Sequence, residues 1–344
     1  MPNAETDFLI IGQGLAGSIL SIQLIEKGYS VTVLDNSHHA SSSVVAAGII
    51  NPITGHRLNI TERFHKYYSV AERFYHRYEQ THGLCVFKLI EQIRLIKNAG
   101  QFEYSKQRLT CADYQGLIER CDSSLMHDQG FGALRVNKTA VVDVQTLLSS
   151  LRDYLLLQQR YFAKKVVYDS IEITQYGVQL GEIQAKNLVF CEGHQAINNP
   201  WLKSLPFKLS KGEILKLRLN AEQQPTMFNW GNWLICEGNS AKLGSSYEWN
   251  DLGLSSTQEV KDKLVSSFES TTKLKAEVLE QQAGIRPTTL HRRPFIGLLS
   301  NTENVYCFNG FGSKGCLTIP YYASIFTDCI DSHEPFPIEL SKWL

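Results

Sequence analysis

The first thirty-five residues alternate between buried-strand and helical patterns. Residues 8–11 form a continuous apolar run, which is typical of a strand buried on both faces of a parallel sheet. Apolar side chains then recur at helical spacing over residues 15–25, and Gly28 stands where a glycine commonly ends a helix. Residues 29–35 indicate a second strand that ends on an acidic side chain. The pattern predicts a strand–helix–strand unit.

Three glycines connect the first predicted strand to the helix. Gly12 allows a tight turn, Gly14 allows a pyrophosphate to approach the backbone, and Gly17 allows the helix to pack closely on the strand. A pyrophosphate would lie at the helix N-terminus, where free N–H groups and the helix dipole favour an anion. Asp35 lies at the offset of about 20 residues at which a carboxylate binds a ribose hydroxyl. This fingerprint predicts dinucleotide binding, but it does not separate FAD from NAD.

A second glycine-rich segment follows a predicted strand near the other end of the chain. Residues 304–308 indicate that strand, residues 309–315 form the loop, and a helical pattern follows. No further strand ending in an acid follows, so we expect this loop to close over the same dinucleotide. A helix N-terminus directed at a flavin ring would stabilise negative charge on its reduced form. The arrangement favours a flavoprotein over an NAD enzyme, with a structural glycine turn as the alternative.

The middle of the chain separates these two glycine motifs. Residues 36–57 indicate a loop whose small side chains at 41–48 leave backbone N–H groups open to a flat ring. Helices are predicted over residues 61–80 with Thr61 as N-cap, from Val141, and from about Ser256. Strands are predicted at 165–168, 170–173, 177–180 and 186–190. Shorter strands and turns are predicted over 85–138 and from 208 onward.

These patterns predict an α/β protein, α+β overall, with two interleaved domains. A Rossmann-type dinucleotide domain is expected to comprise residues 1–84, 139–207 and 276–344. An antiparallel-sheet substrate domain is expected to comprise residues 85–138 and 208–275.

Composition excludes several classes of protein. The 344 residues include 34 Lys and Arg against 34 Asp and Glu, and this balance argues against a polyanion-binding protein. The eight cysteines are scattered without zinc-ligand spacing, so we expect reduced thiols, no metal and a cytoplasmic protein. The apolar run at residues 8–11 is too short for a signal peptide or a membrane span.

The chain resembles the FAD-dependent D-amino-acid oxidase and glycine oxidase superfamily over nearly its whole length. The resemblance rests on four motifs in the expected order: residues 12–17 with Asp35, residues 41–50, residues 188–193 leading to 211–213, and residues 283–297 with 309–315. Each motif alone is weak, and the ordered set is specific.

The resemblance implies roles for individual residues. The loop after Asp35 would run along pyrophosphate and flavin, a residue near Val167 would meet adenine, and the last loop would meet the pyrimidine end of the flavin. Covalently linked relatives do not carry their cysteine at Cys316, so non-covalent FAD is implied. The expected cofactor contacts are Gly12, Gly14, Leu15, Ala16, Gly17, Asp35, Asn36, Ser42, Ser43, Ala46, Ala47, Gly48, Val167, Cys191, Gly193, Phe311, Gly312, Ser313, Lys314, Gly315 and Cys316.

Two residues are expected to contact the substrate. Arg286 matches the arginine that holds the substrate carboxylate in family oxidases, and a guanidinium suits a bidentate grip on a carboxylate. Tyr247 is the candidate for a substrate-contacting tyrosine of the middle domain. The polar segment 51–57 either lines the substrate pocket or fixes the exit of the chain from the site.

The implied activity is oxidation of the C–N bond of an amino acid or related primary or secondary amine. Hydride would pass to flavin N5, and oxygen or another acceptor would reoxidise the flavin. Such chemistry depends on orienting a neutral amine, so it needs no strong protein base. The alternatives are an oxidase of the tRNA-modification type and a non-catalytic flavin-binding protein. We expect a small-molecule amine as substrate, and no nucleic acid.

Overall fold

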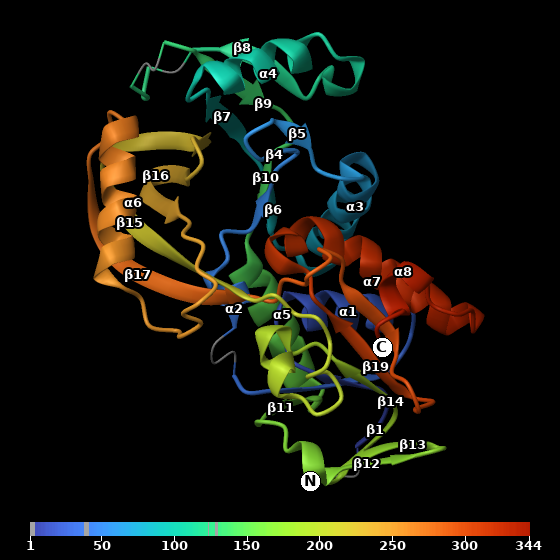
Figure 1. Cartoon of the computed structure of the whole chain (residues 1–344). Coiled ribbons are helices and arrows are strands. Elements are labelled where there is room, and N and C mark those ends of the chain that lie inside the picture. The colour runs from blue at the N-terminus through green and yellow to red at the C-terminus, as the bar shows by residue number, and fades with distance from the viewer. Residues whose placement is uncertain (1–3, 38–40, 123, 128–129) are drawn as a thin grey trace.

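The computed structural model describes residues 4–37, 41–122, 124–127 and 130–344, and it contains two large sheets (Figure 1). The first sheet has eight strands in the order β11-β2-β1-β14-β13-β12, with β19 beside β14 and β18 beside β19. Its strands are β1 (Ala4–Ile11), β2 (Val31–Asp35), β11 (Tyr161–Ala163), β12 (Ile171–Thr174), β13 (Gly177–Leu180), β14 (Ile183–Phe190), β18 (Phe295–Leu298) and β19 (Val305–Asn309).

Strand β1 lies at the centre of this sheet because its side chains are apolar on both faces. Phe8 and Ile10 enter one hydrophobic core, whereas Leu9 and Ile11 enter another. β1 is parallel to β2 and to β14, and β14 is parallel to β19. Helices α1 (Leu15–Glu26), α5 (Val144–Leu157) and α7 (Gly315–Ser332) pack together beside the sheet, as Figure 1 shows. Both predicted glycine motifs therefore belong to one sheet.

The second sheet carries the segments expected to form the substrate domain. Its order is β16-β15-β7-β9-β8, and β17 pairs with β15. Its strands are β7 (Glu91–Leu95), β8 (Ile118–Cys121), β9 (Ala133–Val136), β15 (Ser210–Asn229), β16 (Trp233–Gly244) and β17 (Ala276–Arg286). Helix α6 (Gln258–Thr271) covers one face and contributes Leu264 and Phe268 to a separate core. The long β15–β16 hairpin is bent, so that the Trp233 ring at the start of β16 lies against Gly244 at its end.

The remaining helices and strands lie outside the two large sheets. β3, β10 and β6 form a small sheet, and β4 pairs with β5. These elements are α2 (Ser42–Val45), β3 (Ile49–Ile50), β4 (Ile53–Thr54), β5 (Asn59–Ile60), α3 (Phe64–His82), β6 (Phe87–Leu89), α4 (Ala99–Leu109), β10 (Ala140–Val142) and α8 (Ile338–Ser341). Short 3₁₀ helices occupy residues 112–114, 168–170, 193–198 and 312–314.

The two sheets are interleaved along the chain, as the sequence predicted for the fold class. The first sheet takes strands from residues 4–35, 161–190 and 295–309, and the second takes strands from 91–136 and 210–286. The strand pairing differs from the expected domain boundary at residue 276. β17 pairs with β15 in the second sheet, whereas the prediction assigned residues 276–286 to the dinucleotide domain. The local sequence did not indicate this pairing, because the partner residues lie more than fifty positions earlier in the chain.

Several predicted element ends differ from the structure. Helix α3 begins at Phe64 after a left-handed Arg63, and Thr61 does not cap it with its side chain. Residues 140–142 form β10, so helix α5 begins at Val144 under the Asp143 cap. Residues 165–167 form no strand, and residues 42–45 of the predicted loop are helical. Residues 38–40 of that loop lie outside the described residues.

No helix among the described residues is both long and apolar enough to cross a membrane. Each of the eight cysteines is free, and all eight lie in described segments.

Candidate active site

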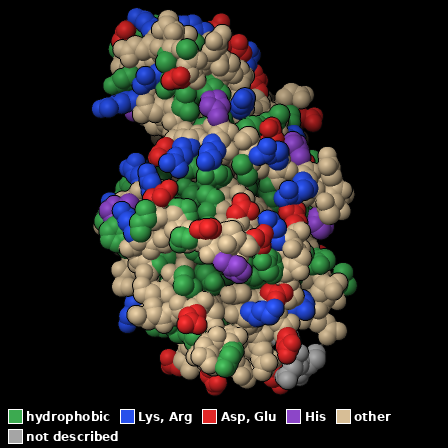
Figure 2. Space-filling view, turned by 90° about the vertical axis from the view of Figure 1, so that its right-hand side faces the viewer, with side chains coloured by type: hydrophobic (Ala, Val, Ile, Leu, Met, Phe, Trp, Pro, Cys, Tyr) green, Lys and Arg blue, Asp and Glu red, His purple; other side chains and the backbone are tan. Residues whose placement is uncertain are grey.

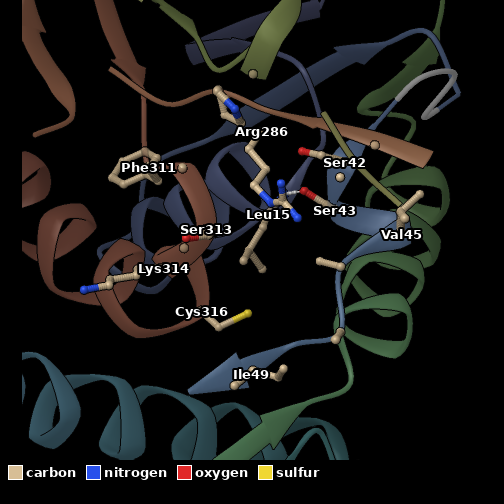
Figure 3. Close-up of a pocket in the computed structure, with 18 of the residues that line it drawn as sticks. Leu15, Ser42, Ser43, Val45, Ile49, Arg286, Phe311, Ser313, Lys314 and Cys316 are labelled. Atoms are coloured by element: carbon tan, nitrogen blue, oxygen red, sulfur yellow. Dashed lines mark hydrogen bonds between the residues drawn. The ribbon is translucent and has the colours of Figure 1, made fainter. Parts of the chain in front are cut away.

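A cavity of about 730 Å³ lies between the two sheets. This volume is within the range of cofactor and ligand sites. Figure 2 shows hydrophobic side chains in the middle of one face, with Lys, Arg, Asp and Glu side chains around them. In Figure 3, Leu15, Ser43 and Arg286 border one open space, and the Cys316 sulfur points into it.

The glycine fingerprint forms one wall of this cavity. Gly12 has φ +101°, a conformation that favours glycine, and both Gly12 and Gly14 line the cavity. A Cβ on Gly17 would lie 1.9 Å from the Gly12 carbonyl oxygen, so no other side chain fits between helix and strand. Gly17 itself lies outside the lining. Gly17 therefore permits close packing, and Gly14 leaves the backbone open toward the cavity.

Asp35 lies at the end of β2 on the same wall. One carboxylate oxygen accepts a hydrogen bond of 2.8 Å from the Gln13 backbone N–H. The Tyr161 hydroxyl lies 3.5 Å from the other oxygen. Asp35 and Asn36 both line the cavity. The first glycine turn thus fixes the carboxylate predicted to bind a ribose.

The loop after Asp35 is tied to the start of helix α1. The Ser43 hydroxyl oxygen accepts a hydrogen bond of 2.9 Å from the Leu15 N–H, and the Ser41 hydroxyl accepts one from the Ser43 N–H. Residues 41–43 and 45–49 line the cavity. Gly48, with φ +74°, has no room for a Cβ because the Val142 carbonyl oxygen lies 2.0 Å from that position.

The C-terminal glycine loop lines the cavity beside the first glycine turn, and a Cβ on Gly315 would lie 3.4 Å from the Leu15 side chain. Residues 311–316 all line the cavity, and helix α7 begins there at Gly315. Burial raises the pKa of the Cys316 thiol to about 12. A protonated thiol is a poor nucleophile, which is compatible with the non-covalent cofactor that the sequence implies.

Near the expected adenine site, the residues that line the cavity are one position away from the predicted residue. Val167 is 62% exposed and lies outside the lining, whereas its neighbours Val166 and Tyr168 line the cavity. Cys191 and Gly193 line it as expected. Sequence reasoning missed Glu192 between them, a buried carboxylate that accepts hydrogen bonds from Tyr168 at 2.7 Å and Asn199 at 2.6 Å. Burial raises the pKa of Glu192.

Arg286 and Tyr247 meet at the end of the cavity formed by the second sheet. The guanidinium carbon of Arg286 lies 4.3 Å from the centre of the Tyr247 ring. The guanidinium donates hydrogen bonds to the carbonyls of Lys211 and Ser246 and to the Ser245 hydroxyl. Burial lowers the pKa of Arg286, and no carboxylate of the described residues pairs with it. The arrangement leaves a partly buried cation facing the cavity.

Gly212 explains how the arginine fits. A Cβ at Gly212 would lie 1.9 Å from a terminal nitrogen of Arg286, so the guanidinium occupies the space above this glycine. The flanking Lys211 and Glu213 are buried and lie 3.5 Å apart, and Lys211 also reaches Asp251 and the Ser255 carbonyl. This network anchors residues 245–257, which carry Tyr247. The Lys-Gly-Glu motif at residues 211–213 was visible in the sequence. It did not indicate the contact of Gly212 with Arg286, because the two residues are distant in the chain.

Other lining residues escaped prediction. Arg94, Lys97, Asn229 and Trp233 line the cavity from the second sheet and its loops. His56 lines it from segment 51–57, which favours the first of the two roles considered for that segment. Among the described residues, no group of three or more His, Cys, Asp or Glu side chains is arranged to hold a metal.

A strand–glycine-turn–helix unit, with a cationic pocket on a second sheet, is typical of an enzyme that uses a dinucleotide cofactor. The family model for FAD dependent oxidoreductases, DAO, matches residues 7–329, and the chain belongs to this family. It is therefore an FAD-dependent oxidoreductase.

Solved structures share this fold. Glycine oxidase from Bacillus cereus ATCC 14579 is 16% identical and superposes with a TM-score of 0.80 over 96% of both chains. Iminodiacetate oxidase from Chelativorans sp. BNC1 is 17% identical, with a TM-score of 0.79 over 97% of this chain and 98% of that one.

A curated relative is similar in sequence but longer. The tRNA 5-methylaminomethyl-2-thiouridine biosynthesis bifunctional protein MnmC of Legionella pneumophila (strain Corby) is 22% identical over 370 residues. The match covers 92% of this chain and 53% of the relative, so the chain spans about half of that protein's length.

The residues present fit FAD. Gly12 makes the turn with φ +101°, Gly14 leaves the backbone open for a pyrophosphate, and Asp35 is fixed beside them. The start of α7 lines the same cavity. The two glycine loops both line the cavity and would supply the backbone N–H groups that a flavin dinucleotide requires.

Proposed function

We propose that the protein oxidises the C–N bond of a small amine that carries a carboxylate. The observation that carries this proposal is Arg286, a cation in the FAD cavity without a carboxylate partner among the described residues. A carboxylate is the ligand that a guanidinium binds best, through two parallel hydrogen bonds. The names of the glycine oxidase and iminodiacetate oxidase neighbours support an amino acid or related amine.

The chain's own residues bind and orient the substrate. Arg286 binds the carboxylate, and the Tyr247 ring lies against the guanidinium. FAD, which the Gly12–Gly14 turn, Asp35 and residues 311–316 would hold, would supply the two-electron acceptor for the hydride of the carbon next to nitrogen, and oxygen or another acceptor would reoxidise it. The amine enters neutral and its N–H proton passes to solvent, which leaves an imine. Water then converts the imine to a carbonyl compound and ammonia or a primary amine.

Product analysis tests this proposal. After reaction of holoenzyme with a panel of glycine, N-methylglycine, and both enantiomers of common amino acids, at least one member should give a carbonyl product. One carbonyl compound and one amine or ammonia should form for each substrate consumed. Flavin turnover with a carboxylate-bearing amine but without a carbonyl product would contradict C–N oxidation.

A second candidate substrate is an amine attached to tRNA. The similarity to MnmC supports it, although the chain spans about half of that relative. Binding of tRNA that weakens steeply with salt, together with flavin reduction by modified tRNA and by no free amine, would favour this candidate.

A further inference from the structure

The part of the cavity outside the predicted FAD-binding segments is cationic. Its lining includes Arg94, Lys97 and Arg286. The acidic side chains of the described lining, Asp35 and Glu192, both belong to the FAD-binding walls. One substrate carboxylate at Arg286 would leave the other two cations without an anion.

Arg94 reaches the cavity from the middle of the second sheet. Its neighbours Ile93 and Leu95 enter the core under helix α6, so Arg94 lies on the opposite face of β7. There it is paired with Asn229 of β15, which also lines the cavity. Arg94 is only 6% exposed. An arginine is seldom buried to this extent without a partner of opposite charge.

The contacts of Arg94 leave its charge uncompensated. Two of its terminal N–H groups donate to the carbonyls of Ile53 at 3.2 Å and Gly55 at 2.8 Å. Its Nε is buried with no acceptor, and no acidic side chain of the described residues forms an ion pair with it. Burial lowers the pKa of Arg94 to about 10. Because a buried charge costs free energy unless it is paired, an anionic ligand here would offset that cost.

Two further cavity residues lie on segments next to Arg94. Lys97 follows β7, and its Nζ lies 3.9 Å from where a Cβ on Gly231 would stand. His56 follows directly on Gly55, whose carbonyl accepts from Arg94. We define Arg94, Lys97 and His56 as the Arg94 subsite.

We propose that the substrate amine carries two carboxylates, one bound by Arg286 and the second bound by the Arg94 subsite. This inference rests on the proposed function, because it names the substrate class of the same cavity. Arg94 also holds the turn at residues 53–55, so occupation of the subsite would fix the cavity wall that segment 51–57 forms.

Ligand binding tests the subsite without requiring turnover. Calorimetric titration of the holoenzyme would compare succinate with its half-amide succinamate, and glutarate with glutaramate. Each pair has nearly the same shape and differs by one charge. We expect each diacid to bind about tenfold more tightly or better, the size expected for one charged hydrogen bond. Equal affinities within each pair, including no detectable binding of any diacid, would overturn the proposal.

Two variants assign the preference to the subsite. Arg94→Gln removes the charge while retaining an amide donor for the Ile53 and Gly55 carbonyls, and it should reduce the preference to within about twofold. Lys97→Gln changes an exposed side chain, so folding should be unaffected, and the preference should fall by about threefold. Lys106→Gln, on the outer surface of helix α4, is the matched control and should retain the wild-type preference. A preference that persists in both subsite variants would contradict the assignment.

Failure of the inference differs from failure of the proposed function. If monocarboxylate amines reduce the flavin and diacids bind no more tightly than their half-amides, the subsite is wrong and C–N oxidation stands. If diacids bind preferentially through Arg94 but no amine reduces the flavin, the proposed function fails.

Discussion

Replacing Arg286 with alanine should leave FAD bound while kcat/KM for a carboxylate-bearing amine falls roughly 30- to 1000-fold. The arginine would provide a charged, bidentate contact in a cavity that is partly shielded from water. Loss of that contact should cost about 2–4 kcal/mol of transition-state binding, with charged hydrogen bonds contributing about 1.5–3 kcal/mol each and adding incompletely. Arg286→Lys should recover only part of the loss, because an ammonium group cannot reproduce the guanidinium fork. Stopped-flow reduction of the bound flavin measures the effect.

Two controls separate a lost substrate contact from local misfolding. Arg286 also holds the carbonyls of Lys211 and Ser246, so the variant could disturb the loop that carries Tyr247. A decarboxylated analogue of the substrate should therefore reduce wild type and variant at nearly equal rates. Arg218→Ala removes an exposed arginine of the same strand pair, bonded to Glu277, and should behave as wild type. Unchanged kcat/KM in Arg286→Ala would refute the carboxylate role.

Replacing Gly14 with valine should abolish FAD binding. A Cβ at Gly14 would lie 3.2 Å from the Ser43 hydroxyl and 3.6 Å from the Ser41 hydroxyl, and the valine methyls would enter the cavity that Gly14 lines. These methyls would occupy the space expected for the pyrophosphate. The ratio of flavin to protein after purification measures the loss, and circular dichroism checks that the apoprotein is folded.

Gly28→Ala is the matched control for Gly14→Val. Gly28 has φ +91°, and no atom lies within 4 Å of the position that a Cβ would take, so alanine would meet no ligand. It should cost about 1 kcal/mol or a little more in unfolding free energy through its left-handed conformation, with FAD retained. Equal flavin loss in both variants would show that Gly14→Val acts through folding.

The local sequence predicted those parts of the fold in which neighbours along the chain determine the structure. The first strand, helix and second strand follow from apolar spacing and three glycines within thirty-five residues. Element ends that depend on distant partners were wrong. Residues 140–142 pair with β3 and β6, which removes them from the predicted helix. Phe64 begins its helix because Arg63 adopts a left-handed conformation, which no local signal indicated.

The motifs indicated residues that line the cavity, whereas lining residues brought there by pairing between distant strands were not indicated by the sequence. The glycine loops, the segment after Asp35, and Arg286 all lie on the cavity. Val167 lies one residue from lining positions, because an irregular segment replaces the predicted strand. Arg94 could not be identified, because its place depends on the parallel pairing of β7 with β15. The only signal for Arg94 in the sequence was a charged residue within a segment that forms a buried strand.

Anaerobic reduction of the bound flavin by an amine is the decisive test of C–N oxidation in this cavity. The flavin absorbance of the holoenzyme would be followed during mixing with carboxylate-bearing amines, including dicarboxylates, and with their decarboxylated analogues. We expect at least one carboxylate-bearing amine to bleach the flavin completely, at a rate that far exceeds that of its decarboxylated analogue. A flavin that stays oxidised with every amine, while dithionite reduces it, would refute amine oxidation.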